Sequence, residues 1–223
     1  MGKLNWGKRA HAVALLCGMT AIALRAQTFT TLHSFEFTDG AYPFGGLIQA
    51  TDGNLYGTTD SGGPSSFCGI DGCGTVFKIT PSGSLTTLYS FCPQSGCPDG
   101  SNPLSALIQA TDGNFYGSTA NGGAYGAGTV FRITASGTLT TLYSFCGQGY
   151  PCTDGSEPAA ALIQATKGRF YGTTRLGGTN NDGTVFRIEP NGTLVQLHSF
   201  SGTDGTNPSA LIQAADGNFV SVR

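Results

Sequence analysis

The feature that most constrains this chain is a sequence repeat that recurs almost verbatim. A first block, LIQATDGNLYGTT and its near-copies, begins at Leu47, Leu107, Leu162 and Leu211, at spacings of 60, 55 and 49 residues. A second block, GTVFKI or GTVFRI, begins at Gly74, Gly128 and Gly183, and each copy is followed by a third block of the type LTTLYSF. Each copy of such a period is expected to be one structural unit.

Every repeat contains four short strand candidates, namely LIQA, FYGTT, GTVFRI and LTTLYSF. They are rich in Thr, Val, Ile, Phe and Tyr, which suit a pleated, half-buried surface. The first two are joined by Asp52-Gly53-Asn54 and its equivalents, a tight hairpin signal. Four antiparallel strands in about 50 residues match one propeller blade. The sequence therefore predicts an all-β fold of tandem four-stranded antiparallel blades, similar to a β-propeller.

The repeats add up to just under four blades. Three complete units are preceded by an outer-strand candidate at Thr28–Phe35 and followed by two inner-strand candidates within Leu211–Val222. Thr28–Phe35 is expected to join this incomplete fourth blade, which lacks its third strand. Three outcomes stay open: a strained four-bladed ring, an open arc that oligomerises through its exposed blade edges, or a truncated copy of a longer parent.

The three blocks resemble the GloVer (Gloeo-Verruco) tandem repeat of exported bacterial proteins, from Thr28 to about Phe219. The resemblance implies a propeller-like architecture and a location outside the cell, and it supplies no catalytic residue. The chain departs from the repeat pattern after Phe219, where Val-Ser-Val-Arg replaces the expected Tyr-Gly-Thr-Thr.

Residues 1–26 are predicted to be a signal peptide, and 27–223 the repeat domain. Lys3, Lys8 and Arg9 form a positive start, and the mostly apolar run that follows is too short for a comfortable membrane span. We expect a secreted or cell-surface protein with no membrane span after signal removal. Without residues 1–26, the chain keeps 7 basic and 13 acidic side chains, which disfavours nucleic acid as a partner.

Six cysteines lie in three close pairs between predicted strands: Cys68 and Cys73, Cys92 and Cys97, Cys146 and Cys152. In an exported chain this pattern favours local disulfides that stiffen long loops. The alternative is a zinc site made from two C-x4-C pairs. That spacing is looser than in most zinc knuckles, and no histidine is near in sequence.

The expected blade topology separates two faces. The first-to-second and third-to-fourth turns are short and uniform, so their face is interpreted as structural. The second-to-third loops and the crossovers between blades vary in length and carry all the cysteine pairs, and variable loops on a fixed scaffold usually carry binding. We expect a non-enzymatic binding or scaffold module that contacts a glycan or a protein at the cell surface.

Each crossover contains the motif D-G-x-x-P, with its aspartate at Asp39, Asp99, Asp154 and Asp204. These carboxylates are candidate ligands for calcium, the only cofactor that the sequence suggests, or for sugar hydroxyls. The favoured interpretation is an Asx-type turn that recurs in every unit. The glutamines of the first strand are likewise expected to satisfy neighbouring backbone groups rather than to line a channel: Gln49, Gln109, Gln164 and Gln213.

Asp60 and Asp182 are not part of the repeated pattern and complete the candidate ligand-binding residues. They support an alternative function, a propeller-type lyase or hydrolase acting on polysaccharide or a small lactone. No catalytic motif is present, however, so no catalytic residue is assigned and the enzyme hypothesis is not favoured. A third alternative is a nonfunctional fragment of a longer repeat array.

Overall fold

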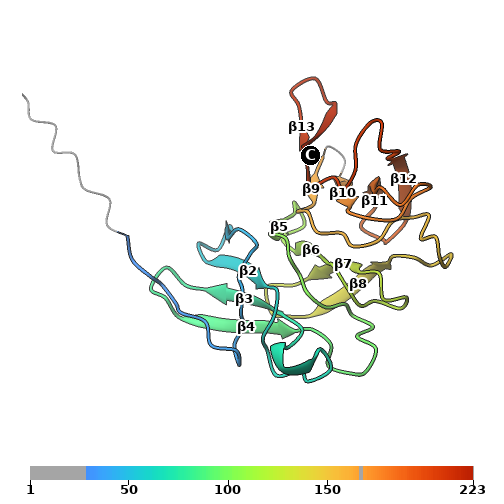
Figure 1. Ribbon diagram of the computed structural model, residues 1–223. Coiled ribbons are helices and arrows are strands. Elements are labelled where there is room, and N and C mark those ends of the chain that lie inside the picture. Colours follow the sequence, from blue (N-terminus) through green and yellow to red (C-terminus); the bar gives the residue numbers. More distant parts are fainter. Residues whose placement is uncertain (1–28, 166–167, 223) are drawn as a thin grey trace, which may run out of the picture. The chain divides into compact units, whose positions relative to one another are not determined.

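The computed structural model describes residues 29–165 and 168–222, with the side chains of the last two excepted. The predicted signal peptide lies outside the described residues. The chain divides into two units, 1–31 and 32–223, and all strands among the described residues lie in the second unit (Figure 1). Among the described residues, no helix is long and apolar enough to cross a membrane.

Three complete four-stranded antiparallel sheets follow one another along the chain, each a meander in sequence order. Blade 1 consists of β1 (Ile48–Gln49), β2 (Leu55–Thr59), β3 (Thr75–Ile79) and β4 (Leu85–Ser90). Blade 2 consists of β5 (Ile108–Gln109), β6 (Phe115–Thr119), β7 (Thr129–Ile133) and β8 (Leu139–Ser144). Blade 3 consists of β9 (Ile163–Gln164), β10 (Phe170–Thr174), β11 (Thr184–Ile188) and β12 (Leu194–Ser199). The predicted blade and its four strands are confirmed.

The fourth sheet is a hairpin of β13 (Ala210–Gln213) and β14 (Phe219–Val222), as expected for an incomplete blade. The strand predicted at Thr28–Phe35 is wrong over the described residues 29–35, which pair in no sheet. A strand needs a ladder partner, and over the described residues the fourth sheet consists of β13 and β14 alone, with no third strand that this segment could join. Its Phe35 instead packs against Phe77 of blade 1, with ring centroids 4.9 Å apart.

The hairpins between first and second strands are held by their own side chains. Asp52 accepts hydrogen bonds from the backbone N–H of Asn54 at 3.0 Å, from the Asn54 side chain and from the Tyr56 hydroxyl. Gly53 has a φ of 82°, a conformation that glycine adopts without strain. The same contacts recur at Asp112.

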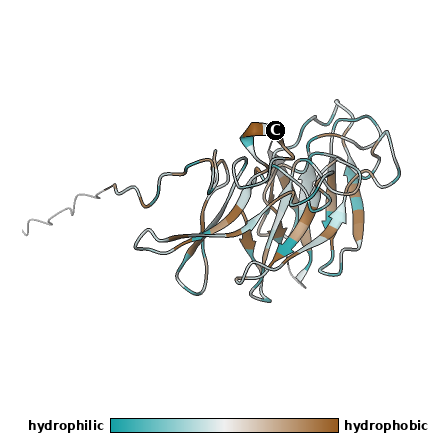
Figure 2. Cartoon of the chain, turned by 90° about the horizontal axis from the view of Figure 1, so that it is seen from below, coloured by the Kyte–Doolittle hydropathy of each residue, from teal (hydrophilic) through white to brown (hydrophobic). Residues whose placement is uncertain are grey.

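Aromatic side chains fill the space between successive blades. Tyr56 stacks on Phe115 and Tyr116 on Phe170, both with centroids 4.1 Å apart. A second set joins the residue after an outer strand to the third strand of the next blade, in the pairs Phe91–Phe131 and Phe145–Phe186. Figure 2 shows hydrophobic and hydrophilic segments alternating along the strands. Such alternation is expected because successive side chains of a strand point to opposite faces of the sheet.

The recurring glutamines also join blades. The side-chain oxygen of Gln109 accepts the backbone N–H of Thr51 at 2.9 Å, and Gln164 does the same for Thr111 at 3.0 Å. Each glutamine thus satisfies a hairpin of the preceding blade. The prediction that these side chains serve the backbone is confirmed at Gln109 and Gln164.

Candidate functional site at the disulfide-bearing rim

The crossovers and the second-to-third loops lie on the same edge of the blades, as the topology predicts. Isolated bridges join the two kinds of loop directly: Ala41 with Ser61, Ser101 with Asn121, and Ser156 with Leu176. We call this edge the disulfide rim. It consists of the crossovers that precede blades 1 to 3 and of the loops β2–β3, β6–β7 and β10–β11.

Each D-G-x-x-P aspartate is engaged within its own repeat. The Asp99 carboxylate accepts the Tyr89 hydroxyl at 2.9 Å and the backbone N–H of Cys92 at 3.0 Å, and Asp154 accepts the corresponding groups of Tyr143 and Cys146. In the two other repeats a histidine takes the place of the tyrosine. His33 contacts Asp39 at 2.8 Å, and His198 contacts Asp204 at 2.7 Å.

These contacts shift the pKa values of two tyrosines and of one carboxyl group. Burial, reinforced by the hydrogen bond to the carboxylate, raises the pKa of Tyr89 and of Tyr143 well above the ordinary tyrosine value. At Asp204 the backbone N–H of Ser201 and the His198 ring, which outweigh a small desolvation effect, hold the carboxyl pKa below its usual range. The aspartates of this motif thus hold backbone N–H groups that precede them in the crossover. An Asx turn instead uses the N–H two residues after the aspartate, so the predicted Asx-type turn stays a prediction here.

The glycine and the proline of this motif have packing roles. A Cβ at Gly100 would lie 2.3 Å from the Thr119 hydroxyl oxygen, and Gly100 has a φ of 107°. Pro103 lies against Gly74 of the preceding blade, where a Cβ would come within 2.6 Å of the proline ring. The same proline contact recurs in the next two crossovers, at Pro158 and Pro208. The motif therefore joins one blade to the next.

The structure does not bring the candidate carboxylates together. Among the described residues, the only group of three or more potential metal ligands consists of cysteines. Asp60 accepts a hydrogen bond from the adjacent Ser61 hydroxyl at 2.9 Å, and its backbone oxygen accepts the Asn102 side chain. Asp182 accepts the backbone N–H of Asn207 through its own backbone oxygen at 2.9 Å. Calcium or sugar binding at these aspartates stays a prediction.

All three predicted disulfides are formed: Cys68–Cys73, Cys92–Cys97 and Cys146–Cys152. The last two occupy equivalent crossovers. The first lies in the β2–β3 loop, where the hydrogen-bonded threonines that flank the loop, Thr59 and Thr75, are 16 residues apart. The corresponding threonines are 10 apart in blades 2 and 3. The longer loop brings the disulfide of blade 1 beside the next one.

Sequence reasoning missed what these closed loops present to solvent. Ile70, between Cys68 and Cys73, is 97% exposed, and Tyr150, between Cys146 and Cys152, is 88% exposed. Phe67 and Tyr125 on the same rim are also more than half exposed. The available signal was the presence of a large apolar residue inside each of two short cysteine-closed loops.

Comparison with solved structures gives the fold of the blades. The chain is similar to virginiamycin B lyase from Staphylococcus aureus, with 15% identity and a TM-score of 0.50, over 79% of this chain and 47% of that one. It is also similar to a streptogramin B lyase, with 13% identity and a TM-score of 0.53, over 82% and 49%. The chain thus spans about half the length of these proteins. At such identities the likeness shows a β-propeller fold alone.

The sequence comparisons identify the repeat itself. No curated protein matches the chain in sequence. A family model for the Gloeobacter/Verrucomicrobia repeat matches residues 19–223, which includes all fourteen strands described above. The chain therefore belongs to the Gloeobacter/Verrucomicrobia repeat family, as the LIQATDGN, GTVFRI and LTTLYSF blocks indicated.

Proposed function

We propose that this chain is a non-enzymatic binding module of the cell surface, which recognises another protein through the disulfide rim. The observation that carries the proposal is the near-complete exposure of Ile70 and Tyr150 at the tips of disulfide-closed loops. A large, mostly apolar side chain that is held in a closed loop is available as an anchor for a protein partner. Closing each loop by a disulfide lowers the entropy lost when such side chains become immobilised on a partner.

The chemistry of the rim favours a protein over a glycan. Ile70 and Phe67 have no polar group, and they flank Cys68 in the same loop. Phe67 also lines a pocket of about 250 Å³ that combines the prolines Pro64 and Pro93 with three serines. Aromatic anchors are typical of the energetically dominant parts of protein–protein interfaces. Tyr125 and Tyr150 of the rim add hydroxyl groups that can make polar contacts with a partner.

Site-specific photo-crosslinking tests this proposal. A benzoylphenylalanine is placed at position 70 or at position 150, and in a matched control at Ala135, which lies exposed in the β7–β8 turn on the opposite edge. On the cells that produce the protein, we expect a discrete crosslinked protein from the two rim positions and none from position 135. Equal crosslinking from all three positions would contradict a specific rim.

The identified partner then permits a quantitative measurement. Replacing Ile70 and Tyr150 together by serine should weaken binding at least about tenfold, since anchor residues contribute about 1–3 kcal/mol each. Reduction of the disulfides should also weaken it. A glycan-array signal in place of a protein partner would reassign the ligand. Turnover of a polysaccharide or lactone, lost in Asp60→Asn or Asp182→Asn, would instead favour the enzyme hypothesis.

A further inference from the structure

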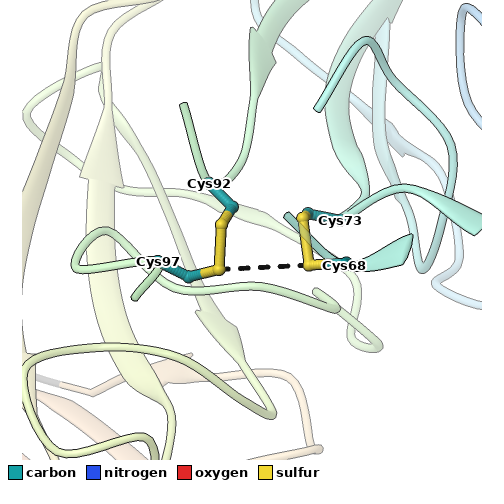
Figure 3. Close-up of side chains that lie close together, drawn as sticks. All are labelled: Cys68, Cys73, Cys92 and Cys97. Atoms are coloured by element: carbon teal, nitrogen blue, oxygen red, sulfur yellow. Dashed lines mark hydrogen bonds between the residues drawn. A yellow bond between two sulfur atoms is a disulfide. The ribbon is translucent and has the colours of Figure 1, made fainter. Parts of the chain in front are cut away.

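Four cysteine sulfurs from two different loops of the rim lie in one cluster. The Cys68–Cys73 disulfide belongs to the β2–β3 loop, and the Cys92–Cys97 disulfide belongs to the crossover between blades 1 and 2. Sγ of Cys68 lies 4.0 Å from Sγ of Cys97, across the gap between the two disulfides (Figure 3). All four Sγ atoms lie within 4.8 Å of one another. Neither loop supplies more than two sulfurs by itself.

The separation between the two disulfides is close to that of the sulfurs in a zinc tetrathiolate. A tetrahedral Zn²⁺ with Zn–S bonds of about 2.3 Å holds its sulfurs about 3.8 Å apart. Breaking the two S–S bonds lets each pair of sulfurs separate toward that distance, while the contact between Cys68 and Cys97 is already near it. Cys73 and Cys92 are fully buried and Cys68 and Cys97 partly so. The cluster is therefore largely protected from water.

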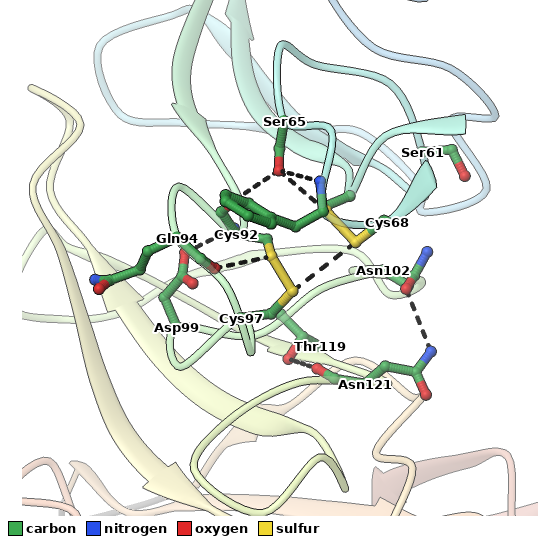
Figure 4. Close-up of a disulfide and its surroundings, with 12 residues drawn as sticks. Ser61, Ser65, Cys68, Cys92, Gln94, Cys97, Asp99, Asn102, Thr119 and Asn121 are labelled. Carbon is green, nitrogen blue, oxygen red and sulfur yellow. Dashed lines mark hydrogen bonds between the residues drawn. A yellow bond between two sulfur atoms is a disulfide. The ribbon is translucent and has the colours of Figure 1, made fainter. Parts of the chain in front are cut away.

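Contacts that do not depend on the S–S bonds hold the cysteines in place (Figure 4). The Ser65 hydroxyl donates a hydrogen bond to the backbone oxygen of Cys92 at 2.6 Å and lies 3.4 Å from Sγ of Cys73, so it bridges the two loops. The backbone N–H of Asn102 donates a hydrogen bond to the backbone oxygen of Cys73. The backbone N–H of Cys92 donates one to the Asp99 carboxylate. These hydrogen bonds involve no S–S bond, so we expect them to persist after reduction.

We propose that Cys68, Cys73, Cys92 and Cys97 form a zinc site in the reduced chain, and that the two disulfides replace this site when the chain is oxidised. On reduction, each protein disulfide takes up two electrons and two protons from a dithiol, which is itself oxidised to a disulfide. The four thiols then release four protons as they bind one Zn²⁺ as thiolates. On oxidation, two disulfide molecules accept the four electrons of the zinc-bound thiolates and become thiolates, and the Zn²⁺ is released. The reduced chain is the state that exists before disulfides form, and zinc would hold the same two loops together in it. The proposal is independent of the rim's partner.

Cobalt substitution provides the direct test. The full chain is reduced with a phosphine in metal-free buffer and titrated with Co²⁺, which reports a tetrahedral thiolate site by visible d–d bands and a sulfur-to-cobalt charge-transfer band. We expect these bands to saturate at one Co²⁺ per chain and to disappear when one Zn²⁺ is added. The double variant Cys146→Ser/Cys152→Ser is the matched control and should keep the full signal. Cys68→Ser/Cys97→Ser should lose it.

Alkylation of the unmutated chain avoids any doubt about folding of the variants. In the reduced chain, stoichiometric Zn²⁺ should slow the alkylation of the four clustered cysteines at least about tenfold, because bound thiolates are poor nucleophiles. Cys146 and Cys152 do not belong to the cluster. Their rate of alkylation, measured by mass spectrometry, should not change when Zn²⁺ is added. Equal protection of all six paired cysteines, or of none of them, would overturn the proposal, as would cobalt bands that survive in Cys68→Ser/Cys97→Ser.

Discussion

The hydroxyl of Tyr89 and the carboxylate of Asp99 are joined by a hydrogen bond of 2.9 Å that connects the end of an outer strand to the crossover that follows it. The same carboxylate oxygen accepts the backbone N–H of Cys92. One side chain thus fixes both the outer strand and the first cysteine of the crossover disulfide. The position equivalent to Tyr89 is tyrosine or histidine in the other repeats, and its partner is an aspartate in every repeat. The pair is therefore conserved among the repeats of this chain.

Removing the hydroxyl tests the energetic role of this pair. Tyr89→Phe keeps the ring but leaves Asp99 without one of its two donors, so the free energy of unfolding should fall by about 1–2 kcal/mol. Urea denaturation of the oxidised chain measures the change. Tyr150→Phe is the matched control, because its side chain is almost fully exposed, and it should leave stability unchanged. Equal stability of the two variants would show that the Tyr89–Asp99 bond has no net effect.

The inner tyrosines predict a loss of stability at alkaline pH. Burial, reinforced by the hydrogen bond to Asp52, raises the pKa of Tyr56 from 10.0 to about 12. A group whose pKa is raised on folding stabilises the fold fully below its unfolded pKa and loses this contribution as pH rises through the folded value. The contribution of Tyr56 should therefore be complete below pH 10 and decline toward about pH 12.

Tyr56→Phe isolates this contribution from those of the other tyrosines. The difference between wild type and variant in urea midpoint should be constant below pH 10 and should shrink as the pH approaches about 12. A difference that does not vary over this range would mean that Tyr56 titrates alike in the folded and unfolded chains.

Most of the fold was accessible from the sequence because local and repeated signals agreed. The Asp52-Gly53-Asn54 hairpin predicts its own turn, and near-identical copies of four strands leave few alternatives to a blade. The prediction failed at Thr28–Phe35, because residues 29–35 find no strand to pair with in the described part of the chain. Ladder pairing depends on the rest of a sheet, and the propensity of a single segment does not report it.

The site was less accessible because it depends on contacts between loops. Spacing predicted the three disulfides, since each closes within its own loop. It did not predict that Cys68 and Cys97, 29 residues apart, approach to 4.0 Å, because this contact arises from the longer β2–β3 loop and from the bridging Ser65. The exposure of Ile70 and Tyr150 is likewise set by the three-dimensional course of their loops.

The glycine of the second strand predicts a matched pair of substitutions. A Cβ at Gly117 would lie 2.7 Å from the Phe131 ring and 2.9 Å from Leu107, and a Cβ at Gly57 would meet Phe77 and Leu47 at nearly the same distances. Leu107 is fully buried, whereas Leu47 is 51% exposed and has room to move. Gly117→Ala should therefore cost about 1–3 kcal/mol of unfolding free energy and Gly57→Ala distinctly less.

Urea denaturation of the two alanine variants checks this comparison. Gly57 and Gly117 occupy equivalent positions of β2 and β6, and both face a phenylalanine ring at the same distance. The difference between the two variants therefore reports how far the neighbouring leucine side chain can move. Equal losses would mean that the phenylalanine rings, which both sites share, determine the cost.

The incomplete fourth blade predicts self-association. Phe91 and Phe145 each contact a phenylalanine of the next blade's third strand. Over the described residues no third strand follows β14, and Phe200 instead borders an apolar pocket of about 480 Å³ together with Leu197 and Val220. An unpaired strand edge beside exposed apolar side chains favours pairing with another chain.

We therefore expect the oxidised chain to associate reversibly as its concentration rises, as measured by sedimentation velocity. Leu197→Lys places a charge at the border of this pocket, where burying it without a partner costs more than about 1.4 kcal/mol, so it should shift the association midpoint at least about tenfold. Thr140→Lys, at an exposed position on β8 of a complete blade, is the control and should leave association unchanged. If both lysine variants and the wild type behave alike, the pocket beside Phe200 is not the contact, and if all remain monomeric at every concentration, the exposed edge of β14 is tolerated without a partner.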